Sequence, residues 1–94
     1  MTEREAFNFR ELKLHILAQQ QGKCLFCDAQ ATELAHRISK SKRNLKRYGK
    51  AVIHHPRNLI GTCSRCNQLA LIDGHPRKIQ RLVTDIVKDI VEGI

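Results

Sequence analysis

Large aromatic side chains are scarce in this 94-residue sequence, which contains three Phe, one Tyr and no Trp. A chain of this length forms one domain and buries only about 60% of the surface that its unfolded form exposes. Because few large side chains are available to fill it, we expect a thin hydrophobic core. The scarcity indicates that something besides apolar burial stabilises the fold.

Long apolar runs are also missing. No stretch approaches the roughly 20 apolar residues that a membrane span needs, and the first residues, MTERE, carry no apolar run of the signal-peptide type. We therefore expect a cytoplasmic protein. In that reducing compartment, paired cysteines bind metal ions more often than they form disulfides.

Acidic residues are absent between Leu34 and Ile72, and the formal net charge of the whole chain is +8. A segment of one charge sign suits a polyanion, because each phosphate that it neutralises releases condensed counterions. We predict binding of nucleic acid, with double-stranded DNA as the expected partner, through Arg37, Lys40, Lys42, Arg43, Lys46, Arg47, Lys50 and Arg57. The alternative is a solvated loop that serves only solubility, although ordinary soluble surfaces mix both signs.

Local sequence signals predict a single α+β domain over residues 1–94. A helix is expected over 2–21, where Thr2 and Glu5 have the spacing of a capping box and Gly22 provides a stop. Short strands are expected over 31–38 and 58–62, a loop or frayed helix over 39–50, and a helix over 64–72.

The last segment carries the clearest periodicity in the chain. Pro76 suits the first turn of a helix. Apolar residues then recur at i, i+3, i+4 and i+7 spacing, at Ile79, Leu82, Val83, Ile86, Val87, Ile90, Val91 and Ile94. We expect this wide stripe to pack against the core of the same domain, and the alternative is a homodimer seam along the C-terminal helix.

All four cysteines belong to two CxxC pairs, Cys24 with Cys27 and Cys63 with Cys66, separated by 35 residues. Four thiolates are the ligand set of closed structural zinc sites. Zinc binding in such sites contributes on the order of 10–16 kcal/mol, as much as the whole stability of a typical domain, about 5–15 kcal/mol. The pattern predicts one structural zinc ion that decides whether the domain folds.

The residues between and around these pairs, ELAHRI at 33–38 and NLIGTCSRCN at 58–67, resemble the HNH endonuclease family in its zinc-knuckle form. In that family a CxxC precedes a strand with the catalytic His, an Asn-Leu pair begins a second strand, and a second CxxC is followed directly by His or Asn. The resemblance covers about residues 24–70. It implies a zinc-stapled ββα-metal core flanked by N- and C-terminal helices, and metal-dependent hydrolysis of DNA phosphodiester bonds.

The resemblance also implies roles for three residues. His36 matches the general base that takes a proton from the attacking water, a task that suits an imidazole with a pKa near neutrality. Asn58 matches the Asn that braces the loop around this base. Asn67 matches the residue that reaches a catalytic divalent ion, and its amide oxygen favours Mg²⁺ or Mn²⁺.

One position departs from the family pattern. The family usually carries Asp, Glu or His immediately before the base, as a second ligand of the catalytic ion, and here that position is Ala35. In the other alignment His36 is the ligand and Arg37 stands in the position of the base. We favour the first alignment, because Arg cannot act as a base at neutral pH.

Three residues could supply the missing ligand. Glu33 lies two residues before Ala35 and shares its strand face, and the alternatives are His54 and His55. If none of them does so, we expect a non-catalytic zinc module that binds DNA or RNA within a larger assembly.

Overall fold

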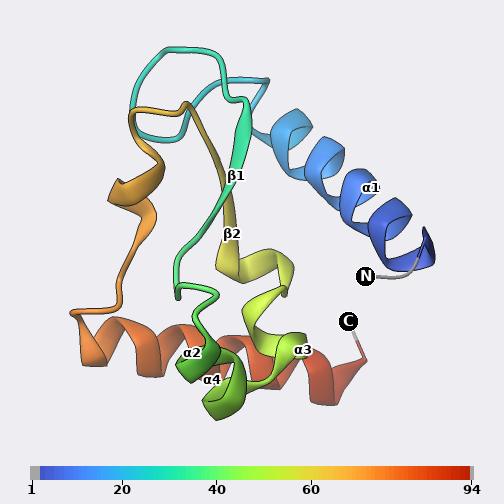
Figure 1. Ribbon diagram of the computed structural model, residues 1–94, viewed down its shortest axis with the longest axis vertical. Coiled ribbons are helices and arrows are strands. Elements are labelled where there is room, and N and C mark those ends of the chain that lie inside the picture. The colour runs from blue at the N-terminus through green and yellow to red at the C-terminus, as the bar shows by residue number, and fades with distance from the viewer. Residues whose placement is uncertain (1–2, 94) are drawn as a thin grey trace.

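The computed structural model describes the backbone of residues 3–93 and the side chains of residues 10–93, and it shows an α+β fold (Figure 1). The elements in chain order are α1 (Glu3–Gln19), β1 (Glu33–His36), α2 (Lys42–Tyr48), α3 (Lys50–Ile53), the 3-10 turn η1 (Pro56–Asn58), β2 (Leu59–Thr62), the 3-10 turn η2 (Asn67–Ala70) and α4 (Pro76–Glu92). The predicted fold class is confirmed. The capping box predicted at Thr2 lies outside the described residues.

The two strands form an antiparallel pair in which Glu33 is opposite Thr62 and His36 is opposite Leu59. Helix α1 covers one face of this pair at Gly61. A Cβ atom on Gly61 would lie 2.6 Å from Leu17 Cδ2, so only glycine allows this close approach.

The side-chain amide of Gln20 secures the contact between α1 and β2. It accepts a hydrogen bond from the Gly61 N–H at 2.8 Å and donates one to the Gly61 carbonyl at 2.9 Å. Because strand side chains alternate between faces, His36 points to the α1 face, whereas Glu33 and Ala35 point to the opposite face, on which η2 lies.

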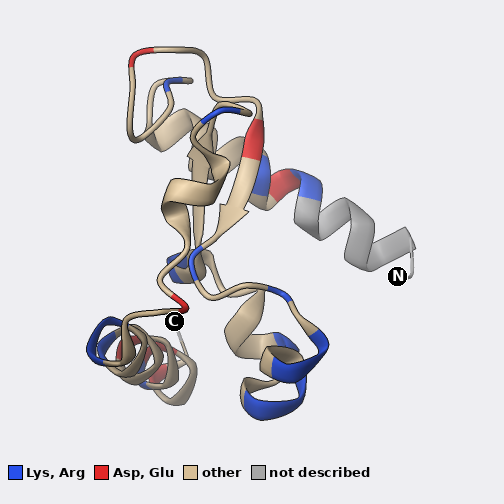
Figure 2. Cartoon of the chain, turned by 60° about the vertical axis from the view of Figure 1, so that its left-hand side comes forward, with Lys and Arg blue, Asp and Glu red and all other residues tan. Residues whose placement is uncertain are grey.

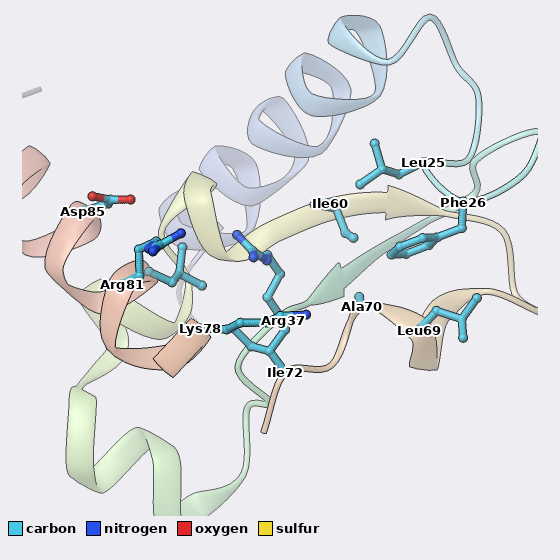
Figure 3. A pocket seen from close by; sticks show the side chains of 11 residues that line it. Leu25, Phe26, Arg37, Ile60, Leu69, Ala70, Ile72, Lys78, Arg81 and Asp85 are labelled. Atoms are coloured by element: carbon cyan, nitrogen blue, oxygen red, sulfur yellow. The ribbon is translucent and has the colours of Figure 1, made fainter. Parts of the chain in front are cut away.

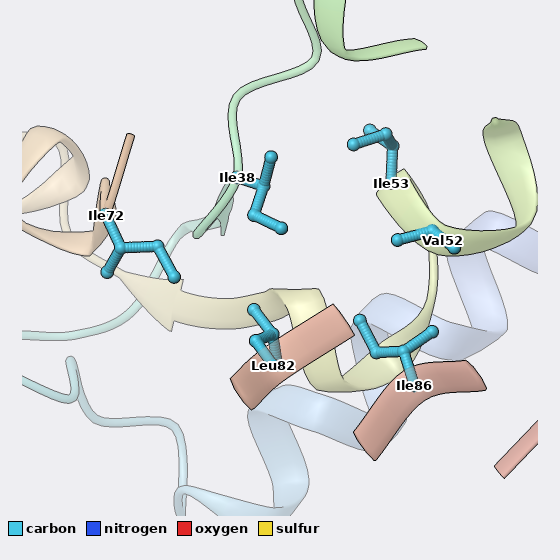
Figure 4. Close-up of a cluster of buried hydrophobic side chains, with 6 residues drawn as sticks. All are labelled: Ile38, Val52, Ile53, Ile72, Leu82 and Ile86. Carbon is cyan, nitrogen blue, oxygen red and sulfur yellow. The ribbon is translucent and has the colours of Figure 1, made fainter. Parts of the chain in front are cut away.

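The hydrophobic core lies at the end of the hairpin where the chain leaves β1 (Figure 4). It consists of the buried residues Ile38, Val52, Ile53, Ile72, Leu82 and Ile86. The cysteine-bearing loops lie at the other end of the hairpin, away from α4 (Figure 1). The hydrophobic core and the cysteine-bearing loops therefore lie at opposite ends of the hairpin.

Helix α4 packs against this core, as its periodicity predicted. Leu82 and Ile86 are buried within the core and Ile79 packs against it, whereas Val87 and Val91 are exposed. The homodimer seam along this exposed part of α4 stays a prediction. Among the described residues, no helix is long and apolar enough to cross a membrane.

The segment predicted as a loop or frayed helix over 39–50 contains α2 and the start of α3. The Ser41 hydroxyl accepts a hydrogen bond from the Asn44 N–H at 3.1 Å and so caps α2. The chain bends between the two helices at Gly49, whose φ of +84° strains any residue with a side chain.

The helix predicted over 64–72 is wrong, since only the 3-10 turn η2 forms there. The chain becomes extended at Leu71. The Ile72 N–H then donates to the Arg37 carbonyl at 2.8 Å, and the Ile72 side chain enters the core. These tertiary contacts end the helix before it can complete a second turn.

Candidate metal centre and catalytic site

The four cysteine sulfurs come together in one cluster, and all lie within 4.8 Å of one another. Cys27 Sγ lies 3.7 Å from both Cys63 Sγ and Cys66 Sγ. A zinc ion with bonds of about 2.3 Å to a tetrahedron of sulfurs requires sulfur separations of about 3.8 Å. Cys24, Cys27, Cys63 and Cys66 are therefore positioned to hold a metal ion such as zinc, whose role in a closed site is structural.

Backbone hydrogen bonds set the geometry of both cysteine loops. The Cys24 N–H donates to the Ala29 carbonyl at 2.8 Å, and the Cys66 N–H donates to the Cys63 carbonyl at 3.2 Å. The first bond closes the loop of residues 24–29 and the second closes a four-residue turn over residues 63–66, and in both segments the two cysteine sulfurs reach the same cluster. The CxxC spacing predicted this arrangement.

Interactions within the cluster separate the thiol pKa values. Burial raises the pKa of Cys24, but hydrogen bonds from backbone N–H groups outweigh it and lower that pKa to about 6. The hydrogen bond with Cys63 raises the pKa of Cys66 to about 12. Four thiolates this close repel one another, and a divalent cation would allow all of them to ionise.

Asn58 is fully buried, and its side chain connects two segments of the chain. Its Oδ1 accepts a hydrogen bond from the Ile38 N–H at 2.8 Å. Its Nδ2 donates to the carbonyls of Ile38 at 3.1 Å and Ile53 at 2.8 Å. Because Ile38 lies two residues after His36 and Ile53 lies directly before His54, this one amide fixes the backbone beside both histidines.

We expect Asn58→Ala to destabilise the fold by about 3 kcal/mol or more, because each of three buried groups left without a partner costs about 1–3 kcal/mol. Asn44→Ala is the matched control, since the Asn44 side chain bonds only to part-buried groups of Ser39. Urea unfolding measures both variants. Equal midpoints for the two would show that Asn58 does not brace this region.

His36 and His54 are in direct contact. His36 Nε2 lies 3.2 Å from His54 Nδ1, and the two half-buried rings meet edge to face. Burial, together with His54 and Lys40, lowers the pKa of His36 to about 4. His36 is therefore neutral at physiological pH and able to accept a proton.

His55 has a different position from His54. Its Nδ1 accepts a hydrogen bond from the Arg57 N–H at 3.1 Å and thereby caps η1. Burial lowers the pKa of His55. Of the two histidines before Pro56, only His54 contacts His36 within the described part of the chain.

Glu33 and Asn67, the two expected ligands of a catalytic ion, contact each other and not His36. Asn67 Nδ2 donates to Glu33 Oε2 at 3.0 Å. Glu33 lies at the cysteine end of β1, opposite Thr62. At about 3.3 Å per residue, His36 is about 10 Å further along the strand, and its side chain points to the opposite face.

This arrangement places both expected ligands of a Mg²⁺ or Mn²⁺ ion away from His36. The Asn67 amide nitrogen donates to one Glu33 oxygen, which leaves the other Glu33 oxygen and the Asn67 oxygen as the ligand type that these ions require. Ala35 lies on the same strand face and is only 2% exposed, and its methyl group offers no ligand. The groups that shift the His36 pKa, His54 and Lys40, include no carboxylate.

The predicted nucleic-acid-binding residues lie mainly on the surface of α2 and its flanks (Figure 2). The exposed members are Lys40, Lys42, Arg43, Lys46, Arg47, Lys50 and Arg57. Arg57 forms an ion pair with Asp89 of α4, which lowers the pKa of that carboxyl. Arg37 lies on another part of the surface, together with Lys78 and Arg81 of α4.

Two features of the site were not identified from the sequence. The contact between His36 and His54 joins residues 18 positions apart, and no local sequence signal indicates it. The position of Lys78 and Arg81 beside Arg37 depends on how α4 packs, for which no local signal exists. Comparison of the chain with protein-family models, with curated proteins and with solved structures finds no match.

Proposed function

We propose that the protein is a metal-dependent endonuclease of the HNH type that hydrolyses DNA phosphodiester bonds, with His36 as its general base. The observation that carries the proposal is the side chain of Asn58, which holds the backbone beside both His36 and His54. The resemblance assigned this Asn a bracing role and this His the role of base.

The charge state and the partner of His36 both bear on the role of base. With a pKa of about 4, it is neutral at pH 7 and can accept a proton from water, and the lowered pKa makes it a weaker base than an imidazole with a pKa near neutrality. His54 restrains the ring through the 3.2 Å contact between the two nitrogens. A base held in one orientation contributes more to the reaction rate than a freely rotating one, because the attacking water must lie within hydrogen-bond reach of its nitrogen.

The same pair of rings also suits the alternative alignment, in which His36 is a metal ligand. Two neighbouring ligands with bonds of about 2.0–2.1 Å lie about 3.0–3.4 Å apart, and His36 Nε2 and His54 Nδ1 are separated by 3.2 Å. Imidazole nitrogens favour Zn²⁺, Ni²⁺ or Co²⁺ over Mg²⁺. The metal preference of the reaction therefore distinguishes the two roles.

A plasmid-nicking assay tests the proposal. Zinc-loaded protein is incubated with supercoiled DNA and Mg²⁺, Mn²⁺, Co²⁺ or Ni²⁺, and the same zinc-loaded protein without an added ion is the negative control. Cleavage that requires the added ion supports the nuclease. Activity with Mg²⁺ and Mn²⁺ indicates oxygen ligands, and activity with Co²⁺ and Ni²⁺ alone indicates the two imidazoles. Tight DNA binding with no cleavage under any of these conditions would overturn the enzymatic function.

A second function, a non-catalytic zinc module that binds nucleic acid, is favoured by one observation. Ala35 occupies the position of a metal ligand and is buried, while Glu33 and Asn67 are hydrogen-bonded to each other. On that face of β1 the position of the expected ligand next to the base is therefore a methyl group, and the two remaining candidate ligands lie away from His36. The nicking assay separates this function from the first, because both functions predict DNA binding and only the first predicts cleavage.

The basic surface of α2 yields a prediction that both functions share. Affinity for duplex DNA is expected to fall with salt, with a log–log slope of about −0.9 per phosphate contacted. Replacing Lys42 and Arg43 by Gln should flatten the slope by up to about 1.8. The control replaces Arg10 and Lys88, which are exposed outside the acid-free segment. Fluorescence anisotropy at several salt concentrations measures the slopes, and equal slopes for both double variants would contradict the prediction.

A further inference from the structure

A cavity of about 520 Å³ opens beside the cysteine cluster, on the η2 face of the hairpin (Figure 3). The first cysteine loop, β2 and η2 form one end, and the first turns of α4 form the other. Its volume lies in the range of about 300–1,000 Å³ that is usual for ligand pockets. We call it the Phe26 groove, after the one aromatic side chain that lines it.

One end of the Phe26 groove is apolar and open to solvent. Leu25, Phe26 and Leu69 are 56%, 43% and 64% exposed, and Ile60 of β2 lies between them and the opposite end (Figure 3). The hydrophobic core lies at the other end of the hairpin and does not include these residues. These exposed apolar side chains are therefore separate from the core.

The other end of the groove is cationic. Arg37, Lys78 and Arg81 gather there, with Asp85 at the rim (Figure 3). The salt bridge between Arg57 and Asp89 is the only one among the side chains of residues 10–93. The three cations therefore have no carboxylate of residues 10–93 within 4.0 Å and are available to an anionic ligand.

We propose that the Phe26 groove binds an unpaired nucleotide of a nucleic-acid strand. The base packs against Phe26 at the apolar end, and its phosphates bind Arg37, Lys78 and Arg81. A flat aromatic contact accepts any base, because every base has a π-face, and guanidinium groups bind phosphate with paired hydrogen bonds. This inference rests on the proposed binding of nucleic acid and adds that an unpaired strand is bound at a second site.

The Phe26 groove and the α2 surface differ in what they can contact. The α2 surface carries charges without an apolar floor, which suits the phosphates of a duplex. In the groove, Phe26 reaches the face of a base only when that base is out of the stack. A strongly acidic peptide would also satisfy the cations, but the aromatic site and the neighbouring cationic site match the base and the phosphate of a nucleotide.

The test compares single-stranded with duplex DNA. Zinc-loaded protein binds a labelled oligothymidylate of about 12 nucleotides or a duplex, and anisotropy gives both affinities. Phe26→Ala should weaken single-strand binding by about 5-fold or more, since base–aromatic stacking is worth about 1–3 kcal/mol, and should leave duplex binding unchanged. Replacing Lys78 and Arg81 by Gln should flatten the single-strand salt slope by about 0.7 per lost phosphate contact.

The Lys42 and Arg43 double variant is the reciprocal control, and it should weaken duplex binding more than single-strand binding. If Phe26→Ala loses its zinc, the Lys78 and Arg81 double variant replaces it as the test of the groove, because both residues lie on α4, away from the cysteines. If the folded variants keep the single-strand affinity of the wild type and duplex binding is intact, nucleotide binding in the Phe26 groove is overturned. The proposed function is not affected by that result. Binding of a polyglutamate peptide that depends on Phe26, without an effect on oligothymidylate, also overturns it. Absence of all nucleic-acid binding overturns the proposed function itself.

Discussion

Cys63→Ser is expected to unfold the domain or to lower its melting temperature by tens of degrees. The sulfurs of Cys24, Cys27, Cys63 and Cys66 lie within 4.8 Å of one another, and a zinc ion in such a site contributes on the order of 10–16 kcal/mol. This equals or exceeds the stability of a typical small domain, about 5–15 kcal/mol. The core of six buried residues lies at the other end of the hairpin, so it cannot hold the cysteine loops in place.

Elemental analysis and thermal unfolding by circular dichroism measure this effect together. Wild-type protein should contain one zinc ion per chain, and EDTA should reproduce the melting behaviour of the variant. Ser64→Ala is the matched control, because Ser64 is exposed and lies in the same loop without a sulfur. A wild-type protein without zinc, or a Cys63→Ser variant that melts as the wild type does, would refute the structural role of the cluster.

His36→Ala should reduce DNA cleavage by about 10²–10⁴-fold, the contribution of a positioned general base, while zinc content and DNA affinity stay close to wild type. His54→Ala should cause a smaller loss, because it frees the His36 ring and does not remove the base. His75→Ala is the control, since His75 is exposed and its side chain makes no capping hydrogen bond. Single-turnover nicking rates at saturating protein give the ratios.

The pH dependence of cleavage provides a second measurement of the same role. A base works in its neutral form, so the rate is lost as pH falls through its pKa. Because the pKa of His36 is lowered to about 4, kcat/KM should stay level between pH 8 and about pH 5. An unperturbed histidine would instead give a fall centred near pH 6.5. Zinc content must be measured at each pH. A fall in rate centred near pH 6.5 with intact zinc would contradict a base whose pKa is lowered to about 4.

The cysteine cluster shows how far local spacing can predict a site. Each CxxC pair lies in a short segment that a local backbone hydrogen bond closes, over residues 24–29 and 63–66, so the direction of its sulfurs depends mainly on nearby residues. The role of Ile72 shows the opposite case. Its N–H pairs with the Arg37 carbonyl, 35 positions earlier, and this distant bond ends the helix that the local pattern predicted.

The catalytic site required the tertiary structure for the same reason. Glu33 shares a strand face with Ala35, and this periodicity suggested that Glu33 could supply the missing ligand. The folded chain instead bonds Glu33 to Asn67, away from His36, and brings His54 to His36. Periodicity predicts the strand face on which a side chain lies. It does not predict which residues from distant parts of the chain that side chain contacts.

The sequence by itself determined the α+β class, both strands, the C-terminal helix and the two CxxC pairs. Each of these depends on interactions between residues that are close in the chain, or on an apolar period that a single core must bury. The tertiary structure alone decided that Asn58 connects the segments of His36 and His54, because a buried amide must find hydrogen-bond partners wherever the packed chain supplies them. It also decided that Arg37, Lys78 and Arg81 gather at one end of the Phe26 groove, because the packing of α4 against the core sets which of its residues lie beside Arg37.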